Sequence, residues 1–366
     1  MTRPLGEVCT LQRGFDLPTQ DRIPGKFPLV SSSGISDTHS EAPVVGPGVV
    51  TGRSGSIGNV FFIEEDFWPL NTTLYIKDFH GNDPRFVFHL LHKFDLKKYS
   101  GGTGVPTLNR NDVHGEMVSV PSDVKEQQRI VAILDEAFDG IATAKANAER
   151  NLQNARALFE SHLQSVFSER GDGWEEKTIS VLAKHSLGKM LDKVKNKGDL
   201  QPYLRNINVR WFAFDLSDIL EMRFLEAEAA RYTAVKGDVL ICEGGYPGRA
   251  AIWDGEDPIY FQKALHRVRF HEPDHNKWFV YFLYWQDKSG LLKQHFSGTG
   301  IQHFTGEVLS RFKLPIPPLP ILRKLVARIE ELSIETQRLE SIYQQKLAAL
   351  AELKKSLLHQ AFSGAL

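Results

Sequence analysis

The C-terminal part of the chain has a regular spacing of seam positions. From Ile329 onward these positions recur at alternating steps of three and four residues. The seam consists of Ile329, Leu332, Thr336, Leu339, Tyr343, Lys346, Leu350, Leu353 and Leu357. This spacing is typical of a helix that buries one stripe against a partner helix. It predicts a long amphipathic helix whose seam has two polar interruptions, Thr336 and Lys346.

The same pattern occurs earlier in the chain. Ile130 corresponds to Leu325 and Phe167 to Phe362, an offset of 195 at both ends with no net gap. The equivalent seam consists of Leu134, Ala137, Ile141, Ala144, Ala148, Asn151, Ala155, Leu158 and His162. Because this seam is mostly small and the other is bulky, the two helices, each roughly 57 Å long, are expected to pack closely together. A pseudo-twofold relation would make them antiparallel.

Two polar residues, Asn151 and Lys346, occupy equivalent seam positions near the middle of the helices. Buried polar seam residues can fix the register of a helix pair. The alternative is that both side chains point to solvent, and the pattern does not choose between the two.

The segments before each helix also repeat. VVTGRSGSIGNVFFI (residues 49–63) resembles VLICEGGYPGRAAIW (residues 239–253), and both predict a strand, a Gly-rich turn and a second strand. Residues 100–121 and 297–317 each run from a Gly/Thr loop into an apolar strand that ends at a proline. Gly-rich hairpins can resemble each other by chance, but loops and helices repeated in the same order indicate an internal duplication.

The repeat predicts an α+β fold with two mixed α/β domains and two long helices packed as an antiparallel coiled coil. We expect globular domains at residues 1–125 and 169–320, and long helices at residues 126–168 and 321–366.

Composition changes this picture little. Of 366 residues, 42% are hydrophobic and 24% are charged, as in ordinary globular proteins. The 44 basic and 45 acidic residues give a net charge of −1, so any surface that binds phosphates must be a local one. Cys9 and Cys242 lie far apart and are expected to be small buried residues of a cytoplasmic protein. The absence of a long apolar run predicts no membrane span.

Enzyme signatures are missing from the sequence. It contains no Walker A loop and no tetrapeptide typical of amino-methyltransferases, and GRSGSIG (residues 52–58) is not a GxGxxG motif. His89 and His92 lie in an apolar, helix-like stretch and are expected to be structural. We therefore predict no catalytic residue and no metal site in this chain.

A longer series of motifs points to a family. GRSGSIGNV (residues 52–60), the SGGTG and SGTG loops, EQQRIVAILDE (residues 126–136) and VKGDVLICEGG (residues 235–245) occur in an order that resembles Type I restriction-modification specificity subunits. IPPLPILRKLVARIEEL also resembles that family. It departs from it at Ile321 and Leu322, where the family commonly has Glu and Gln, and this puts in doubt a polar contact at the start of the second helix.

The resemblance implies a non-catalytic, DNA-binding protein. Each globular domain would be a target recognition domain that reads one half of a split site in double-stranded DNA, and the helices would set the spacing. Two methyltransferase subunits would dock near the helices, with Gln128, Arg129 and Arg323 as candidate contacts. They would form an adenine-N6 methyltransferase that uses S-adenosylmethionine, while this chain binds no cofactor. Restriction-translocation subunits could join to allow cleavage.

Gly-rich turns allow a backbone to approach a DNA duplex, and polar side chains on them can reach base edges or phosphates. The candidates in the first domain are Arg53, Ser54, Ser56, Asn59, Thr103, Thr107, Asn109 and Arg110. The candidates in the second domain are Tyr246, Arg249, Lys263, Thr299, Gln302 and His303. Arginine serves both guanine and phosphate, which favours Arg53, Arg110 and Arg249. For each residue the alternative is an exposed loop position without a role.

The turns differ in sequence, RSGSIGN against EGGYPGR, so two different half-sites are expected rather than a palindrome. Two other functions compete with this one. One is a methyltransferase with unfamiliar motifs, which would turn over S-adenosylmethionine alone. The other is a coiled-coil adaptor that ignores nucleic acid, in which Arg249→Ala would leave DNA affinity unchanged.

Overall fold

The computed structural model describes all residues except 102–104, 193, 299 and 301. The chain separates into two units, Met1–Arg150 with Tyr343–Leu366, and Asn151–Ile342. Two long helices, α3 (Val124–Ser168) and α8 (Leu319–Ser363), contribute one part to each unit. Each unit therefore contains one globular domain and a segment of both helices.

The first domain has two larger sheets, the two-stranded pairs β1-β11 and β10-β9, and the α-helices α1 and α2. A four-stranded antiparallel sheet has the order β2-β8-β5-β6, and a three-stranded sheet has the order β4-β3-β7 with β3 and β7 parallel. The strands are β1 (Thr2–Pro4), β2 (Thr10–Arg13), β3 (Phe27–Ser31), β4 (Gly34–His39), β5 (Gly48–Gly52), β6 (Val60–Ile63), β7 (Trp68–Pro69), β8 (Thr73–Asp78), β9 (Ser100–Gly101), β10 (Thr107–Leu108) and β11 (Met117–Ser119). The helices are α1 (Pro84–Lys93) and α2 (Arg110–His114).

The second domain repeats this topology. Its four-stranded sheet has the order β13-β22-β19-β20, and a second sheet has the order β17-β14-β21-β18 with β14 and β21 parallel. The strands are β12 (Glu175–Thr178), β13 (Ala183–Leu187), β14 (Asp199–Leu204), β15 (Val209–Arg210), β16 (Ala213–Phe214), β17 (Leu220–Phe224), β18 (Thr233–Ala234), β19 (Val239–Cys242), β20 (Ala250–Ile252), β21 (Ile259–Phe261), β22 (Leu265–Phe270) and β23 (Lys313–Ile316). The helices are α4 (Ile179–Leu182), α5 (Ala229–Tyr232), α6 (Asp274–Lys288) and α7 (Gly306–Arg311).

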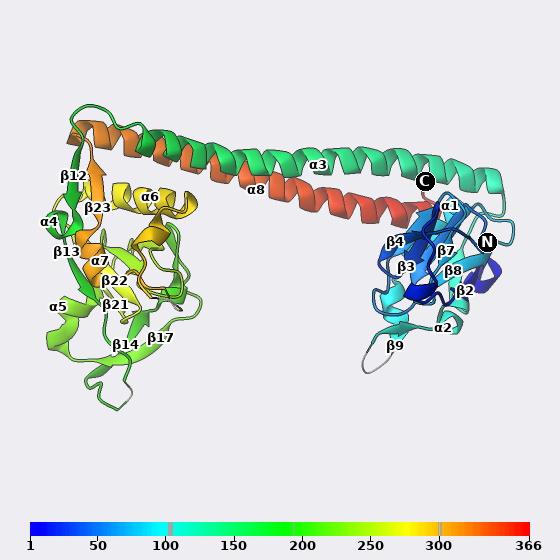
Figure 1. The fold of residues 1–366 in the computed structure, drawn as a ribbon, viewed down its shortest axis with the longest axis horizontal. Coiled ribbons are helices and arrows are strands. Elements are labelled where there is room, and N and C mark those ends of the chain that lie inside the picture. Colours follow the sequence, from blue (N-terminus) through cyan, green and yellow to red (C-terminus); the bar gives the residue numbers. More distant parts are fainter. Residues whose placement is uncertain (102–104, 193, 299, 301) are drawn as a thin grey trace. The chain divides into compact units, whose positions relative to one another are not determined.

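Strand pairing confirms the duplication seen in the sequence. β1 pairs with β11 in the first domain as β12 pairs with β23 in the second, directly before α3 and α8 respectively. The second domain adds the hairpin β15-β16 and the helix α5. Figure 1 shows the related sheets, blue to cyan in the first domain and green to yellow in the second.

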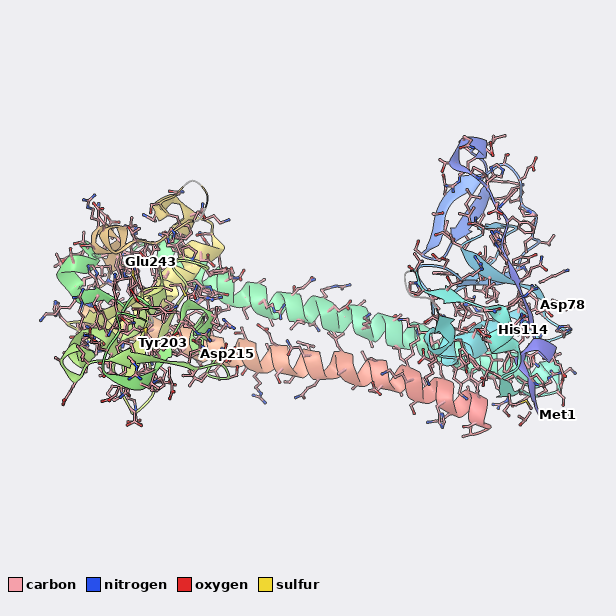
Figure 2. All side chains as sticks on the ribbon, turned by 90° about the horizontal axis from the view of Figure 1, so that it is seen from below. Met1, Asp78, His114, Tyr203, Asp215 and Glu243 are labelled. Carbon is pink, nitrogen blue, oxygen red and sulfur yellow. The ribbon has the colours of Figure 1, made fainter. Side chains whose placement is uncertain are left out.

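Local sequence explains why the short helices begin where they do. The Asp83 side chain accepts a hydrogen bond from the Phe86 backbone N–H at 2.9 Å, and Pro84 occupies the first turn of α1. In α7 the Thr305 side chain caps the backbone N–H of Val308. The Nε2 atom of His114, labelled in Figure 2, accepts a hydrogen bond from the Leu11 backbone N–H at 3.0 Å and so ties α2 to β2.

The long helices pack together as predicted. In the first unit, Ile130 and Leu134 near the start of α3 share a core with Leu358 and Phe362 near the end of α8. Because the start of one helix lies beside the end of the other, this pairing is antiparallel, and the two ribbons run side by side (Figure 1).

The second unit pairs the helices in the same sense. Phe159 and Phe167 near the end of α3 lie in one core with Leu322 and Ile329 near the start of α8. An ion pair between Arg156 Nε and a Glu340 carboxylate oxygen, 3.0 Å apart, lies further along the two helices.

Each domain holds its helix pair through an aromatic contact at repeat-equivalent positions. The ring centroids of Phe86 on α1 and Phe362 on α8 are 5.1 Å apart, and those of Trp278 on α6 and Phe167 on α3 are 4.7 Å apart. All four side chains are buried. Phe167 and Phe362 are equivalent positions, 195 residues apart. Each packs the end of its helix against an aromatic residue of a globular domain.

After Ala148 the heptad seam predicted for α3 holds at Ala155 but is wrong at Asn151 and Leu158. Leu158, a predicted seam residue, is 51% exposed, whereas Phe159 is only 9% exposed. Asn151 is exposed and Leu152 is partly buried instead. Ala148 and Phe159 are eleven residues apart, and an eleven-residue period lies closer to the natural 3.6 residues per turn than a heptad does. The buried stripe therefore follows the natural periodicity of the helix more closely than a heptad does.

The outcome is similarly mixed in α8 beyond Tyr343, where the predicted seam residues Leu350 and Leu357 are partly buried but two others are exposed. Lys346 is exposed and Leu353 is 47% exposed, while Leu347 is partly buried and Leu358 is 8% exposed. Leu347 and Leu358 are again eleven residues apart. Since Asn151 and Lys346 both face solvent, the solvent alternative holds and neither residue fixes the register.

Candidate nucleic-acid interface

Three chain segments meet beside the β5-β6 turn of the first domain. The backbone N–H of Arg53 donates to the Thr72 carbonyl at 2.8 Å, and the Leu108 N–H donates to the Arg53 carbonyl at 2.8 Å. The Gly55 N–H also donates to the Pro106 carbonyl at 3.2 Å. The two loops chosen separately from the sequence are therefore hydrogen-bonded to each other. We call the meeting point of residues 53–59, 71–72 and 105–109 the first junction.

The turn of the first junction needs its glycines. A Cβ atom on Gly52 would lie 1.9 Å from the Ser56 carbonyl oxygen. Gly58 has φ +94°, in the left-handed region that other residues rarely adopt. The turn consequently keeps a tight shape that presents its polar residues together.

The candidate side chains of this turn differ in exposure and in the contacts that they already make. Arg53 is partly buried, and its Nη1 atom donates to the Asn71 carbonyl at 3.3 Å. Ser56 and Asn59 are exposed, whereas Ser54 is partly buried and forms a β-bridge with Thr107. These side chains can contact a ligand without breaking the backbone bonds of the junction.

Other candidates of the first domain have structural contacts. Asn109 caps α2 by accepting a hydrogen bond from the Asn111 N–H at 3.1 Å. Arg110 is exposed, and its Nη1 atom donates to the Leu11 carbonyl at 3.4 Å. Thr103 lies outside the described residues.

The second domain builds an equivalent junction. The Glu243 N–H donates to the Ala264 carbonyl at 2.9 Å, and the Phe304 N–H donates to the Glu243 carbonyl at 2.8 Å. These two bonds reproduce those of Arg53, so residues 243–249, 262–264, 297–298 and 302–304 form the second junction. Figure 2 labels Glu243 within this domain.

Tyr246 and Arg249 are held by their own domain. The Arg249 guanidinium lies 4.9 Å from the centroid of the Tyr246 ring, and its Nη2 atom donates to the Asn206 carbonyl at 3.1 Å. The Tyr246 hydroxyl donates to an Asp287 carboxylate oxygen at 3.1 Å, but the residue remains 42% exposed. Tyr246 thus remains accessible, and the Arg249 guanidinium packs against its ring.

Two of the remaining candidates of the second domain, Lys263 and His303, lie near Glu243. Lys263 and Gln302 are exposed, and His303 is partly buried with its backbone paired to Ser297. Thr299 lies outside the described residues. Burial raises the pKa of the Glu243 carboxyl group, and the nearby His303 and Lys263 side chains act in the opposite direction.

Two junction residues, Asn71 and Glu243, were missed in the sequence. Asn71 precedes Thr72 as Lys263 precedes Ala264, so aligning the two repeats through these short links would have found it. The candidates chosen from the sequence are basic or neutral polar residues, and Glu243 is acidic. Its position directly before the Gly-rich turn, which matches Arg53, was the available signal.

The candidate partner contacts lie at the start of each long helix. Gln128 is exposed. Arg129 is also exposed and pairs with the Glu126 carboxylate, while its Nη2 atom donates to the Leu366 backbone carbonyl at 2.8 Å. Arg323 pairs with Asp274, with 2.7 Å between Nε and the carboxylate oxygen.

The start of α3 has a buried polar contact that α8 lacks. Gln127 is 1% exposed, and its Nε2 atom donates to the Asn82 side chain at 2.8 Å and to the Pro121 carbonyl at 2.9 Å. Its Oε1 atom accepts from the Asp83 N–H at 2.9 Å. At the equivalent position Leu322 is fully buried in an apolar core. The departure from the family pattern thus replaces a polar contact by an apolar one.

Both cysteines are buried, as predicted. Burial raises the pKa of Cys9 to about 12 and that of Cys242 to about 11, so neither thiol is activated. Within the described parts of the chain, no cluster of three or more potential metal ligands occurs. No helix among those residues is long and apolar enough to span a bilayer.

Two domains with the same topology and the same loop junction, each packed on an antiparallel helix pair, define a duplicated protein with two related candidate binding surfaces. The family model described as Type I restriction modification DNA specificity domain matches residues 1–151 and 171–347. The chain belongs to this family, which confirms the resemblance drawn from its motifs. Its members are non-catalytic specificity subunits that recognise DNA target sites for the complex and bind no cofactor themselves.

Individual relatives agree with this assignment. A putative type I restriction enzyme specificity subunit of Haemophilus influenzae is 21% identical over 347 residues, which cover 90% of this chain and 86% of that protein. A chain from a solved type I restriction-modification system has a TM-score of 0.79 at 18% identity, covering 100% of this chain and 98% of that one. The HsdS subunit of Thermoanaerobacter tengcongensis has a TM-score of 0.62 at 19% identity, with 100% and 97% covered. These two structures share the fold.

Proposed function

We propose that the two domains recognise two different halves of an asymmetric, split DNA site. One observation carries this proposal: both domains join the same three segments through the same two backbone hydrogen bonds, yet they present different side chains there. An identical scaffold with different donors and acceptors is suited to reading different base sequences.

Within each junction the residues would have separate tasks. Arg53 can donate two hydrogen bonds to a guanine edge, and Ser56, Asn59 and Thr107 can contact bases or phosphates beside it. In the second domain the exposed groups are Tyr246, Lys263, Gln302 and the ring of His303. Asn109 and Arg249, already bonded within the domain, would position the exposed residues; Arg110 remains a phosphate candidate.

We further propose that two methyltransferase subunits dock near the starts of the long helices. Gln128 and Arg129 on α3, and Arg323 on α8, are exposed there. The partners would bind S-adenosylmethionine and methylate adenine at N6, and restriction-translocation subunits, where they exist, would join this assembly. The similar chain from a solved type I system was described in a study of complex assembly, which supports the presence of partner subunits here. We also infer a cytoplasmic location, where the DNA substrate lies.

The test is to co-express the chain with its methyltransferase subunit in a host without adenine methylation and to map N6-methyladenine across the genome. We expect one motif of two different specific halves separated by unspecified bases. The methyltransferase subunit without this chain is the control and should leave the genome unmodified. A palindromic or continuous motif would contradict the proposal, as would turnover of S-adenosylmethionine by the chain alone.

A further inference from the structure

Arg53 and Glu243 occupy the same place in the two junctions. Each is the residue that follows the inner strand, β5 or β19, by one position. Each donates its backbone N–H to the link before the next strand and accepts a hydrogen bond from the third segment. The two backbones are therefore held in the same way, and the main difference at this position is the side chain.

The two side chains have opposite chemistry. A guanidinium group only donates hydrogen bonds, and an ionised carboxylate only accepts them. Glu243 is partly buried, and among the described residues its carboxylate pairs with no donor group. A carboxylate in this position gains most from a ligand that brings a hydrogen-bond donor.

The surroundings of Glu243 make a carboxylate tolerable near DNA. Lys263 and His303 lie close enough to influence its charge, and a Cβ atom on Gly244 would be only 3.1 Å from the His303 Nδ1 atom. Positive charge beside the carboxylate reduces its repulsion from phosphates. Base amino groups are the donors that the major groove presents, at N4 of cytosine and N6 of adenine.

We propose that Glu243 reads a base amino group in the major groove, and that positions 53 and 243 specify one base in each half-site. This inference rests on the proposed function and extends it to a residue that sets specificity. Arg53 accordingly selects a guanine in one half, and Glu243 selects a cytosine or an adenine in the other.

The test uses the full chain with its methyltransferase subunit and compares wild type with Glu243→Gln and Glu243→Ala. Methylation mapping first gives the two half-sites. Competition binding with duplexes that carry each base at each position of the second half-site then measures discrimination. For one position we expect the preference for cytosine or adenine to fall roughly 5- to 150-fold in Glu243→Ala, the range of a single good base contact.

The matched control is Glu256→Gln, which removes the same charge in the same domain at an exposed carboxylate paired with Lys236. It should leave every preference unchanged, and Arg53→Ala should relax a guanine position in the other half-site only. If a variant abolishes methylation, its circular dichroism and the competition binding still report folding and preference.

Unchanged discrimination at every specified base pair of the second half-site in folded Glu243→Ala would overturn the inference. That outcome leaves the proposed function intact. Failure of that function would instead appear in the wild type, as the loss of a split motif.

Discussion

At the starts of the two long helices, the two repeats differ in one buried residue, Gln127 in α3 and Leu322 in α8. The buried Gln127 side chain makes three hydrogen bonds, two of them to the loop before α1, and its counterpart Leu322 packs among apolar side chains. A buried polar group is costly to leave without a partner, so a polar residue and its partners have to change together. When a buried residue and its partners change together from polar to apolar, the fold is kept although the contacts differ.

The buried glutamine gives a direct prediction. Gln127→Leu should lower the free energy of unfolding by about 1–3 kcal/mol, because Asn82 and the Asp83 N–H lose their partner. Urea denaturation measures this change. Gln128→Leu, at the exposed neighbouring position, is the control and should stay within about 0.5 kcal/mol of wild type. Equal stabilities of the two variants would contradict the assigned contact.

A buried histidine makes a second residue-scale prediction. His266 on β22 is 1% exposed, and burial together with nearby His185 lowers its pKa to about 4. An unfolded histidine takes up its proton near pH 6.5, so acidification from pH 6.5 to pH 4 protonates the unfolded state first. Stability should therefore fall in this window, by up to about 3 kcal/mol from His266 alone.

The measurement is the unfolding free energy at several pH values for wild type and His266→Leu. Leucine is the residue that the first domain has at the matching position, Leu74, which is also buried. The variant should lose less stability on acidification than wild type. An identical pH profile would show that His266 does not titrate in this window.

At the scale of elements, the eleven-residue spacing of the helix stripes determines which side chains carry the packing energy. Phe159→Ala should cost about 3–5 kcal/mol, as expected for a buried aromatic residue. Leu158→Ala, next to it, should cost far less because Leu158 is 51% exposed. Chemical denaturation compares the two variants. A larger loss of unfolding free energy for Leu158→Ala than for Phe159→Ala would support the heptad seam instead.

At the scale of the whole molecule, the length of the two long helices gives the last prediction. We propose that α3 and α8 set the distance between the half-sites. Inserting 22 residues, two periods of the stripe, between Arg150 and Asn151 and again between Ile342 and Tyr343 adds about 33 Å to each helix. That length is close to one turn of DNA, so the unspecified spacer of the methylated motif should grow by about ten base pairs.

These insertion points lie at the boundary between the two units, so both units keep their own contacts. Methylation mapping reads out the spacer. Insertion into α3 alone is the control and should disrupt the helix pair and abolish methylation. A spacer of unchanged length in the doubly extended protein would refute the role of the helices in spacing.

Much of this architecture was determined by the sequence alone. The duplicated order of motifs, with the offset of 195 between the helices, predicted two related α/β domains and two packed helices, because a repeated pattern folds into repeated elements. Motif order also identified the family. The two Gly-rich turns were found as candidate sites, since glycines in that spacing predict tight turns between strands.

Tertiary structure decided the rest. Whether Leu158 or Phe159 faces the partner depends on how a helix of 3.6 residues per turn lies against its neighbours over many turns, which a heptad count does not capture. Asn71 and Glu243 entered the site only because hydrogen bonds bring three distant segments to one junction. Local sequence specifies the turn, but residues far apart along the chain become neighbours only through the packing of the whole domain.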